Sequence, residues 1–214
     1  MKQLKLSVYV FCGVLLLNPT AFAADYSIDP DHTSVSFKIH HLLSYVEGRF
    51  RKFEGSFVYD PDKPESWKAQ AAIQTASIDT NVEPRDKHLR SADFFDVEKY
   101  PAITFVSTGV SDATATSAML HGVLTIHGVQ KPVTLDLQIH GVAKDPWGNV
   151  RAAFTATAAI DRKDFGLLWN KALETGKFLV GDEVMITLEV EGLLKEPVAI
   201  PSTAKADGKS VKKA

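Results

Sequence analysis

The feature of this sequence that most constrains its fold is a strict alternation of apolar and polar residues. Residues 133–139 alternate without a fault, and residues 183–191 place Val184, Ile186 and Leu188 on one face. Side chains of a β-strand point alternately to opposite faces of the sheet, so each run predicts a half-buried strand. Further strands are predicted at residues 33–39, 46–50, 53–59, 68–75, 102–110, 120–126 and 154–160.

A parity shift and two turns separate these strands. The apolar parity slips by one residue between Phe50 and Phe53, and the linking pair Arg51-Lys52 is poor turn chemistry. We therefore expect a bend or bulge in one long strand rather than a hairpin. Residues 60–64 and 145–149 combine Asp with Pro or Gly and are predicted turns.

Helix is expected in only two short segments. One covers residues 84–91, with Pro84 at the first helical position, and a second lies around residues 163–173. Many strands with short links predict an all-β protein, either a sandwich or a closed barrel. Because no Cys–Trp–Cys spacing marks an immunoglobulin sandwich, we favour an antiparallel, lipocalin-like β-barrel of about eight strands with one or two short helices.

The N-terminal segment has the features of a secretory signal peptide. Two lysines precede an apolar run over residues 6–17, and the small-x-small sequence AFA ends at residue 23. The run is too short for a membrane-spanning helix. We expect a signal peptide at residues 1–23, one barrel domain at 24–200, and a disordered polar tail at 201–214, with the mature protein secreted to the periplasm.

Cysteine usage and charge exclude several classes of function. Cys12 is the only cysteine and lies inside the apolar run, where Phe11 rather than a small residue precedes it, which argues against a lipoprotein. The mature chain then has no thiol for a disulfide, a metal site or a nucleophile. Loss of Lys2 and Lys5 changes the formal net charge from −2 to −4, and no basic stripe is present, so nucleic acid is not expected as a partner.

Small residues occur on faces that we assign to the barrel interior. An eight-stranded barrel is either filled by its side chains or holds one small ligand, and small inward residues favour an apolar void. A filled, tapering barrel that serves as an interaction module is the alternative. The small inward residues are Ala69, Ala71, Gly122, Ala156 and Ala158.

The charged stretch at residues 85–105 is the strongest candidate for polar chemistry. His88 with Asp86 and Asp93 would suit a cation, but the chain has no H-E-x-x-H motif and no G-x-S-x-G nucleophile motif. No pair of carboxylates stands out for glycoside hydrolysis.

We favour a structural latch in this stretch. Arg85 and Arg90 would pair with Asp86 and Asp93, while Leu89, Phe94 and Phe95 plug one mouth of the barrel. A variant places Arg85, His88 or Arg90 on a ligand headgroup such as a pyrophosphate or a quinone carbonyl. Trp147 and Trp169 lie in loop segments that either pack on a barrel end or meet lipid at the mouth.

Six segments in order along the chain resemble the YceI-like family of exported lipid-binding proteins. The resemblance covers about residues 26–193, and its segments are IDPDHTSVSF (28–37), the strand through Val46, Gly48 and Phe50, RDKHLRS (85–91), DFFDVEKYPAITF (93–105), GVLTIHGV (122–129) and IDRKDFGL (160–167). It implies a lipocalin-like barrel with a long apolar channel. It also implies amphiphilic ligands such as polyisoprenoids, isoprenoid quinones or fatty-acid derivatives, with no metal and no catalytic triad.

Together these observations predict a periplasmic protein that sequesters or carries an isoprenoid-type lipid and is not an enzyme. The alternative is a secreted hydrolase or metal-dependent enzyme that uses the His88 cluster. No cofactor is expected besides the bound lipid, transient membrane contact is compatible with this role, and a homodimer is left open. The predicted channel lining comprises Phe37, Ile39, Phe50, Phe53, Phe57, Ile73, Leu89, Phe94, Phe105, Leu124, Ile126, Leu135, Leu137, Phe154, Ala156, Ala158, Phe165, Ile186 and Leu188.

Overall fold

The computed structural model describes residues 24–174 and 178–195, so the predicted signal peptide and polar tail lie outside the described residues. Helical structure is limited to α1 (Glu83–Arg90) and the 3-10 turns η1 (Pro64–Ser66), η2 (Thr75–Ser77) and η3 (Arg162–Phe165). The strands are β1 (Ala24–Ile28), β2 (Ser34–His41), β3 (Ser44–Phe50), β4 (Phe53–Tyr59), β5 (Lys68–Gln74), β6 (Ile78–Asp79), β7 (Ala102–Ser111), β8 (Ser117–Ile126), β9 (Val129–Lys144), β10 (Val150–Asp161) and β11 (Val180–Leu194).

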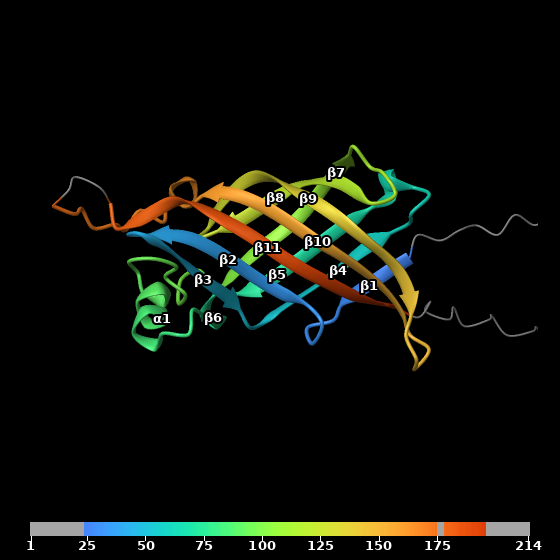
Figure 1. The fold of residues 1–214 in the computed structure, drawn as a ribbon, viewed down its shortest axis with the longest axis horizontal. Coiled ribbons are helices and arrows are strands. Elements are labelled where there is room, and N and C mark those ends of the chain that lie inside the picture. Colours follow the sequence, from blue (N-terminus) through green and yellow to red (C-terminus); the bar gives the residue numbers. More distant parts are fainter. Residues whose placement is uncertain (1–23, 175–177, 196–214) are drawn as a thin grey trace, which may run out of the picture.

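The strands form one antiparallel sheet that closes on itself, as predicted (Figure 1). The ring runs β1-β4-β5-β7-β8-β9-β10-β11, and pairing of β1 with β11 completes it. β2 also pairs with β11, farther toward the N-terminal end of that long strand. β1 and β2 therefore act as one interrupted strand beside β11, and the break falls at residues 29–33.

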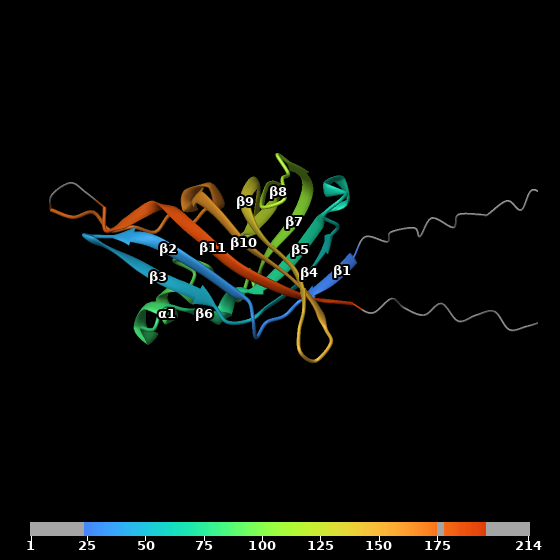
Figure 2. The same cartoon turned by 45° about the vertical axis from the view of Figure 1, so that its right-hand side comes forward.

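The link between β3 and β4 is a bend, as predicted, and not a hairpin. β3 pairs with β2 and β6, whereas β4 pairs with β1 and β5, so the two strands do not pair with each other. The short strand β6, which the alternation did not predict, continues β5 after η2 in the same manner. β2, β3 and β6 thus form the part of the wall beside α1 (Figure 2).

The helical predictions are partly right. α1 begins at Glu83, which places Pro84 at the second helical position rather than the first. The predicted helix at residues 163–173 is wrong, because only the four-residue turn η3 forms there. Gly166 then adopts φ +77°, a left-handed conformation that ends the turn.

Aromatic side chains fill the end of the barrel opposite α1. The rings of Tyr26 and Phe57 stack with centroids 5.0 Å apart, and Phe154 packs edge-on against Phe57 and Tyr59 at 5.3 and 4.9 Å. Trp67 completes this aromatic plug at 4.8 Å from Tyr59. Because offset and edge-to-face aromatic pairs are favourable, this end of the barrel is closed by its own core.

Within the described ranges, no helix has both the length and the apolar character that crossing a membrane requires.

Candidate ligand-binding site

A cavity of about 610 Å³ occupies the barrel interior between the aromatic plug and α1. Its wall is almost entirely apolar. On β2 and β11 the inward side chains Val35, Ile39, Val184 and Ile186 are only half-buried although they face the interior. They remain half-buried because the space in front of them is not filled by other side chains. Apolar surface held open in this way is the environment that a hydrocarbon ligand would occupy.

Most of the predicted lining residues border this cavity, although no bound ligand tests their role. They come from most of the strands of the barrel, from α1 and its following loop, and from η3. The predicted residues at the cavity wall are Phe37, Ile39, Phe50, Phe53, Ile73, Leu89, Phe94, Phe105, Leu124, Ile126, Leu135, Phe165, Ile186 and Leu188.

The remaining predicted residues lie nearer the closed end. Phe57, Leu137, Phe154 and Ala156 border a second, smaller cavity of about 110 Å³ beside the aromatic plug. Ala158 lines neither cavity and instead packs against the core near the plug. The cavity is therefore shorter than the expected channel. The alternation of inward and outward side chains placed the ligand along the whole interior, but aromatic rings occupy the closed end.

Phe105 lies in the wall between the two cavities and borders both of them. Its ring occupies the space in front of Gly122, so a Cβ atom placed on Gly122 would overlap the ring. The prediction that Gly122 leaves a void is therefore wrong, because the absent side chain makes room for Phe105. Ala71 borders both cavities and Ala69 the smaller one, so these small residues do lie beside open space.

The mouth of the cavity is covered by α1, which is held by a latch built from Asp86 and Thr80. Both side chains are buried, and Asp86 Oδ1 accepts hydrogen bonds from Thr80 N at 2.9 Å and Thr80 Oγ1 at 2.5 Å. Arg85 donates from Nε to Thr80 Oγ1 at 2.7 Å and from Nη2 to Thr80 O at 2.8 Å. The helix is thus fastened to the segment after β6.

The latch exists, but its predicted arginine–aspartate pairs are wrong. Arg90 donates to the carbonyl oxygens of Ala76 and Ile78, each at 3.0 Å, and not to Asp86 or Asp93. Carbonyl groups of the kinked β5–β6 segment point toward the helix, and a guanidinium group can satisfy several of them at once. Arg90 does not line the cavity, which removes it from the headgroup candidates.

His88 does not belong to a metal-binding triad. Its Nε2 lies 2.9 Å from Asp93 Oδ2, and its ring packs edge-on against Phe94 and Trp169 at 5.1 and 4.9 Å. Asp86 faces Thr80 instead. In the described ranges 24–174 and 178–195, these three residues do not bring their ligand atoms together, so the metal-dependent enzyme is not favoured.

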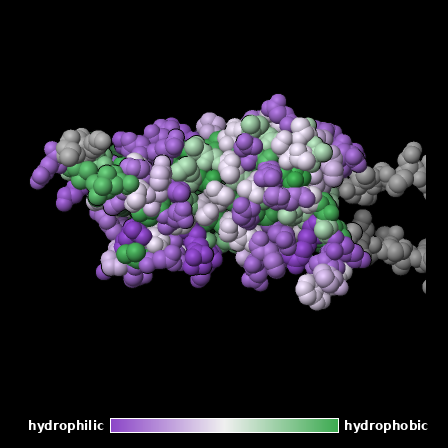
Figure 3. All heavy atoms as spheres, in the orientation of Figure 1, coloured by the Kyte–Doolittle hydropathy of each residue, from purple (hydrophilic) through white to green (hydrophobic). Residues whose placement is uncertain are grey.

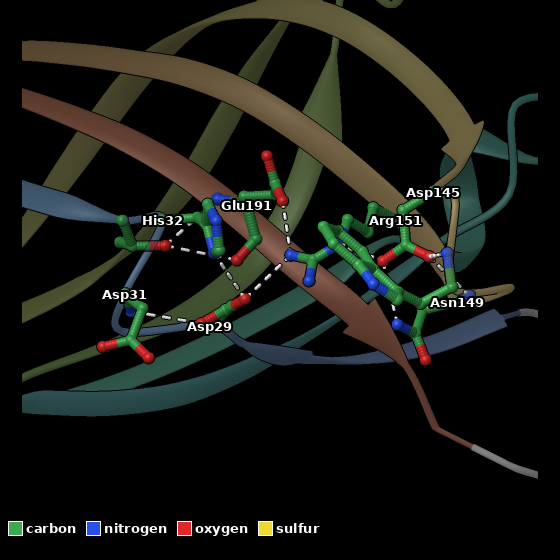
Figure 4. Close-up of polar contacts among 9 residues, drawn as sticks. Asp29, Asp31, His32, Asp145, Asn149, Arg151 and Glu191 are labelled. Carbon is green, nitrogen blue, oxygen red and sulfur yellow. Dashed lines mark hydrogen bonds and ion pairs between the residues drawn. The ribbon is translucent and has the colours of Figure 1, made fainter.

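A group of possible metal ligands does occur elsewhere, at the closed end. Ligand atoms of Asp29, His32 and Glu191 lie within 4.8 Å of one another. Arg151 supplies the positive charge there, with Nη1 at 2.8 Å from Asp29 Oδ2 and 2.5 Å from Glu191 Oε1 (Figure 4). The hydrogen bond from Arg151 holds the pKa of Asp29 below its ordinary value. We call this group the Arg151 cluster and assign it a structural role rather than metal binding. Asp145 also pairs with Arg151, which joins the β9–β10 turn to the cluster.

Arg162 is a cavity residue that the sequence pattern did not reveal. It is buried, and it donates to the carbonyl oxygens of Gly181, Leu167 and Trp169 and to Asp182. Burial lowers the pKa of its guanidinium group, whereas the nearby carboxylate of Asp182 acts in the opposite direction. Arg162 thereby folds the loop after η3 over the cavity.

Other wall residues were missed for different reasons. Val35 and Val190 share strand faces with residues that were predicted, so stricter use of the alternation would have found both. Trp169 lies in a loop without periodicity, and only the three-dimensional structure places it against His88 and Phe94. Trp147 does not pack on the barrel, since its side chain is 83% exposed in the β9–β10 turn.

Four basic side chains lie along the described wall, namely Arg85, Arg162, His41 and His88. No carboxylate lines this described wall. Arg85, His88 and His41 lie at the end that carries α1. The hydrocarbon part of a ligand would contact the apolar remainder of the wall. The site therefore combines an apolar interior with hydrogen-bond donors near its mouth, which suits an amphiphile whose polar group accepts hydrogen bonds.

Comparison with known proteins gives a consistent result. A model of the YceI-like domain matches residues 26–192. A UPF0312 protein of Shewanella baltica is 42% identical over 199 residues, which cover 91% of this chain and 100% of that protein. A UPF0312 protein of Pseudomonas putida is 46% identical over 159 residues, covering 72% of this chain and 83% of that protein.

Two solved structures share the architecture. BcnA of Burkholderia cenocepacia superposes with a TM-score of 0.67 and 28% identity, over 77% of this chain and 98% of BcnA. A polyisoprenoid binding domain from Saccharophagus degradans superposes with a TM-score of 0.61, over 79% of this chain and 98% of that domain. At 15% identity, the second likeness concerns the fold alone.

Proposed function

Because this chain belongs to the YceI-like domain family, we propose that it is a binding protein that holds the hydrocarbon part of an amphiphilic lipid in its barrel cavity without changing it chemically. The observation that carries the proposal is the half-buried apolar lining of β2 and β11 around a cavity of about 610 Å³. Pockets for small molecules usually have volumes of roughly 300–1,000 Å³. Burial of each methylene group contributes about 0.8 kcal/mol, so chain length dominates the expected affinity.

The proposed ligand class is an isoprenoid-type lipid, either a polyprenyl compound or a quinone with an isoprenoid tail. The wall offers many apolar contacts and few polar ones, which supports selection by the length and width of the tail. The domain from Saccharophagus degradans, which is a polyisoprenoid binding domain, supports this proposal through its similar fold. Fatty-acid derivatives fit the same wall and are a comparison class for the experiment.

The headgroup is proposed to lie near Arg85 and His88 at the mouth. Arg85 borders the cavity and already spends Nε and Nη2 on Thr80, which fixes the orientation of its guanidinium group. A carbonyl or phosphate oxygen is the acceptor that such a group suits. Arg85→Gln should weaken binding of a lipid with such a headgroup more than binding of a plain alkane of equal length.

The proposed compartment is the periplasm. The support is the charged, apolar and small-residue order of residues 1–23, which is typical of a secretory signal. Cell fractionation and N-terminal sequencing of the exported protein test this, with cleavage expected before Ala24. Recovery of the chain in the cytoplasm with residues 1–23 retained would contradict it.

The proposed function is tested by lipid recovery and by filling the cavity. Protein purified without detergent should release an isoprenoid-type lipid on organic extraction, and native mass spectrometry should show the bound mass. Ile186→Trp with Leu188→Trp should abolish uptake, because both side chains border the cavity. Glu189→Trp, an exposed position on the same strand, is the matched control and should bind normally. The proposal would be overturned if the variant with the filled cavity took up as much lipid as the unchanged protein. Failure to recover lipid from any preparation of the protein would also overturn it.

A further inference from the structure

Large apolar side chains are exposed at the end of the barrel that carries α1, and five of them lie in the described turns and loops there. They are Leu42 and Leu43 in the β2–β3 turn, Val82 before α1, Leu168 after η3, and Phe178 before β11. Leu43 is 90% exposed and Leu168 is 65% exposed. Hydrophobic surface is visible at this end of the molecule in Figure 3. We call these five residues the mouth rim.

The β2–β3 turn holds Leu42 in a backbone conformation that leucine rarely adopts. Leu42 has φ +56°, a left-handed conformation that Asn and Gly adopt readily and that is rare for a bulky side chain. Tight hairpin turns of two residues usually contain Asn-Gly or Asp-Gly for this reason. Leu42 and Leu43 are both exposed, so core packing does not account for them. Backbone strain of this kind typically accompanies a functional surface.

The mouth rim lies directly at the entrance of the cavity. Leu42 N donates to Leu179 O at 2.8 Å, and Leu179 borders the cavity. Val82 is exposed to solvent and also borders the cavity, so the two surfaces meet at this residue. Leu168 precedes Trp169, another wall residue. The exposed apolar surface and the apolar interior are therefore continuous.

We propose that the mouth rim inserts into the surface of a lipid bilayer and that the ligand passes directly between bilayer and cavity. This inference rests on the proposed function, because a ligand with a long hydrocarbon tail resides in membranes and is poorly soluble in water. The rim residues come from separate turns and loops (Figure 1). Separate apolar side chains of this kind suit a deformable lipid surface, whereas a protein partner generally requires a contiguous complementary face.

Charged groups beside the mouth rim carry both signs. Lys163 lies 2.8 Å from Asp182 and also stands over the ring of Phe178 at 5.7 Å. Glu83 follows Val82 in α1. Attraction to anionic lipid is therefore not the driving force, and burial of apolar side chains is. We expect binding to vesicles of pure phosphatidylcholine, with little change between low and high salt.

The experiment compares vesicle binding of three forms of the full mature chain. Leu43→Glu combined with Leu168→Glu should lower the partition coefficient by roughly tenfold or more for each leucine removed from the apolar phase. Trp147→Glu is the matched control, because Trp147 is also a large apolar residue, is 83% exposed, and lies in the β9–β10 turn at the opposite end. It should bind vesicles like the unchanged protein. All three positions are exposed, and thermal unfolding verifies that each variant folds.

The outcomes separate this inference from the proposed function. The inference and the proposed function are both supported if all three forms take up a fluorescent fatty acid from solution at the normal rate. In addition, only the rim variant should take it up slowly from vesicles. Equal vesicle binding by all forms, or none by any, overturns the docking surface while leaving lipid binding intact. A dimer in solution that the rim substitutions dissociate, without vesicle binding, would assign the rim to a second copy of this chain and also overturn it. Vesicle binding that depends on the rim without any lipid uptake would instead reject the proposed function.

Discussion

The ring of Phe105 lies against Gly122 of the neighbouring strand, where a Cβ atom would come within 2.5 Å of the ring atom Cε2 and 2.7 Å of the carbonyl oxygen of Val106. Glycine at residue 122 therefore fixes the position of a side chain that separates the main cavity from the smaller one. We therefore expect this pair of residues to limit the depth to which a hydrocarbon tail can reach.

Replacing Phe105 should change the length of ligand that the protein prefers. Phe105→Ala joins the two cavities, so the optimum in a series of n-alkyl carboxylates should shift to longer chains. Loss of the ring should also lower the free energy of unfolding by about 3 kcal/mol, the lower end of the range for such truncations. Gly122→Ala should also change the preferred length, because the added Cβ atom would displace the ring. An unchanged length profile in both variants would contradict the dividing role of Phe105.

The buried latch predicts a large effect for Asp86. Asp86→Ala leaves the buried N–H and hydroxyl groups of Thr80 without their acceptor, which should cost about 2–3 kcal/mol in the free energy of unfolding. Release of bound lipid should also become faster, since α1 covers the mouth. Asp86→Asn keeps an acceptor oxygen and should cost less. Chemical denaturation and stopped-flow release measure the two effects.

The control for the latch is Asp93, whose pair with His88 is largely exposed. Asp93→Ala should change the free energy of unfolding by less than about 1 kcal/mol, as exposed ion pairs usually do. A cost at Asp93 equal to that at Asp86 would show that burial does not distinguish the two carboxylates.

The Arg151 cluster predicts loss of stability in acid. Hydrogen bonding from Arg151 holds the pKa of Asp29 below its ordinary value of 3.8, and hydrogen bonds from Asn149 and Arg151 lower the pKa of Asp145. A carboxyl group whose pKa is lower in the folded chain stabilises the fold fully above its unfolded pKa and loses that effect as the pH falls through the folded value. The free energy of unfolding should therefore decrease below about pH 4.

Arg151→Gln tests the source of this pH dependence. The variant should be less stable at neutral pH, and its difference from the unchanged protein should shrink as the pH falls below about 4. In that range the carboxyl groups of the unfolded chain bind protons before those of the folded chain, which favours the unfolded state of the unchanged protein. Lys195→Gln, which removes an exposed ion pair with Asp25, should leave the pH profile unchanged. Parallel pH profiles for Arg151→Gln and the unchanged protein would reject the assignment.

Two buried threonines predict opposite responses to the same substitution. The hydroxyl group of Thr75 is buried without a hydrogen-bond partner among the described residues, so Thr75→Val should raise the free energy of unfolding by about 1 kcal/mol. The hydroxyl group of Thr80 donates to Asp86 and accepts from Arg85, so Thr80→Val should be destabilising. Thermal or denaturant unfolding of both variants gives the two signs directly.

The strands were predictable because alternation is a local signal. Residues 133–139 lie inside β9 and residues 183–191 inside β11. The alternation could not show that β9 continues to Lys144, because a bulge at His140 and Gly141 shifts the register against β10, and Gly141 has φ +105°. The family resemblance also was confirmed, since it drew on several separated segments rather than on one motif.

The partners of the charged residues were not predictable. Arg90 and Asp93 are three residues apart in sequence, which suggested an ion pair, yet Arg90 binds carbonyl groups of a segment 12 and 14 residues earlier. The aromatic plug was missed for the same reason. Face parity places Phe57 and Phe154 inside the barrel, but only the closure of the sheet brings their rings together. Such contacts depend on which strands become neighbours.

The β1 and β11 strands bring the two ends of the described chain together, with Lys195 N at 2.8 Å from Asp25 O, at the end remote from α1 (Figure 2). A dye, a solid support or a fused reporter attached through either end would therefore stand clear of the entrance. The same closeness permits a circularly permuted chain, joined between Lys195 and Ala24 and reopened at the exposed turn around Pro61.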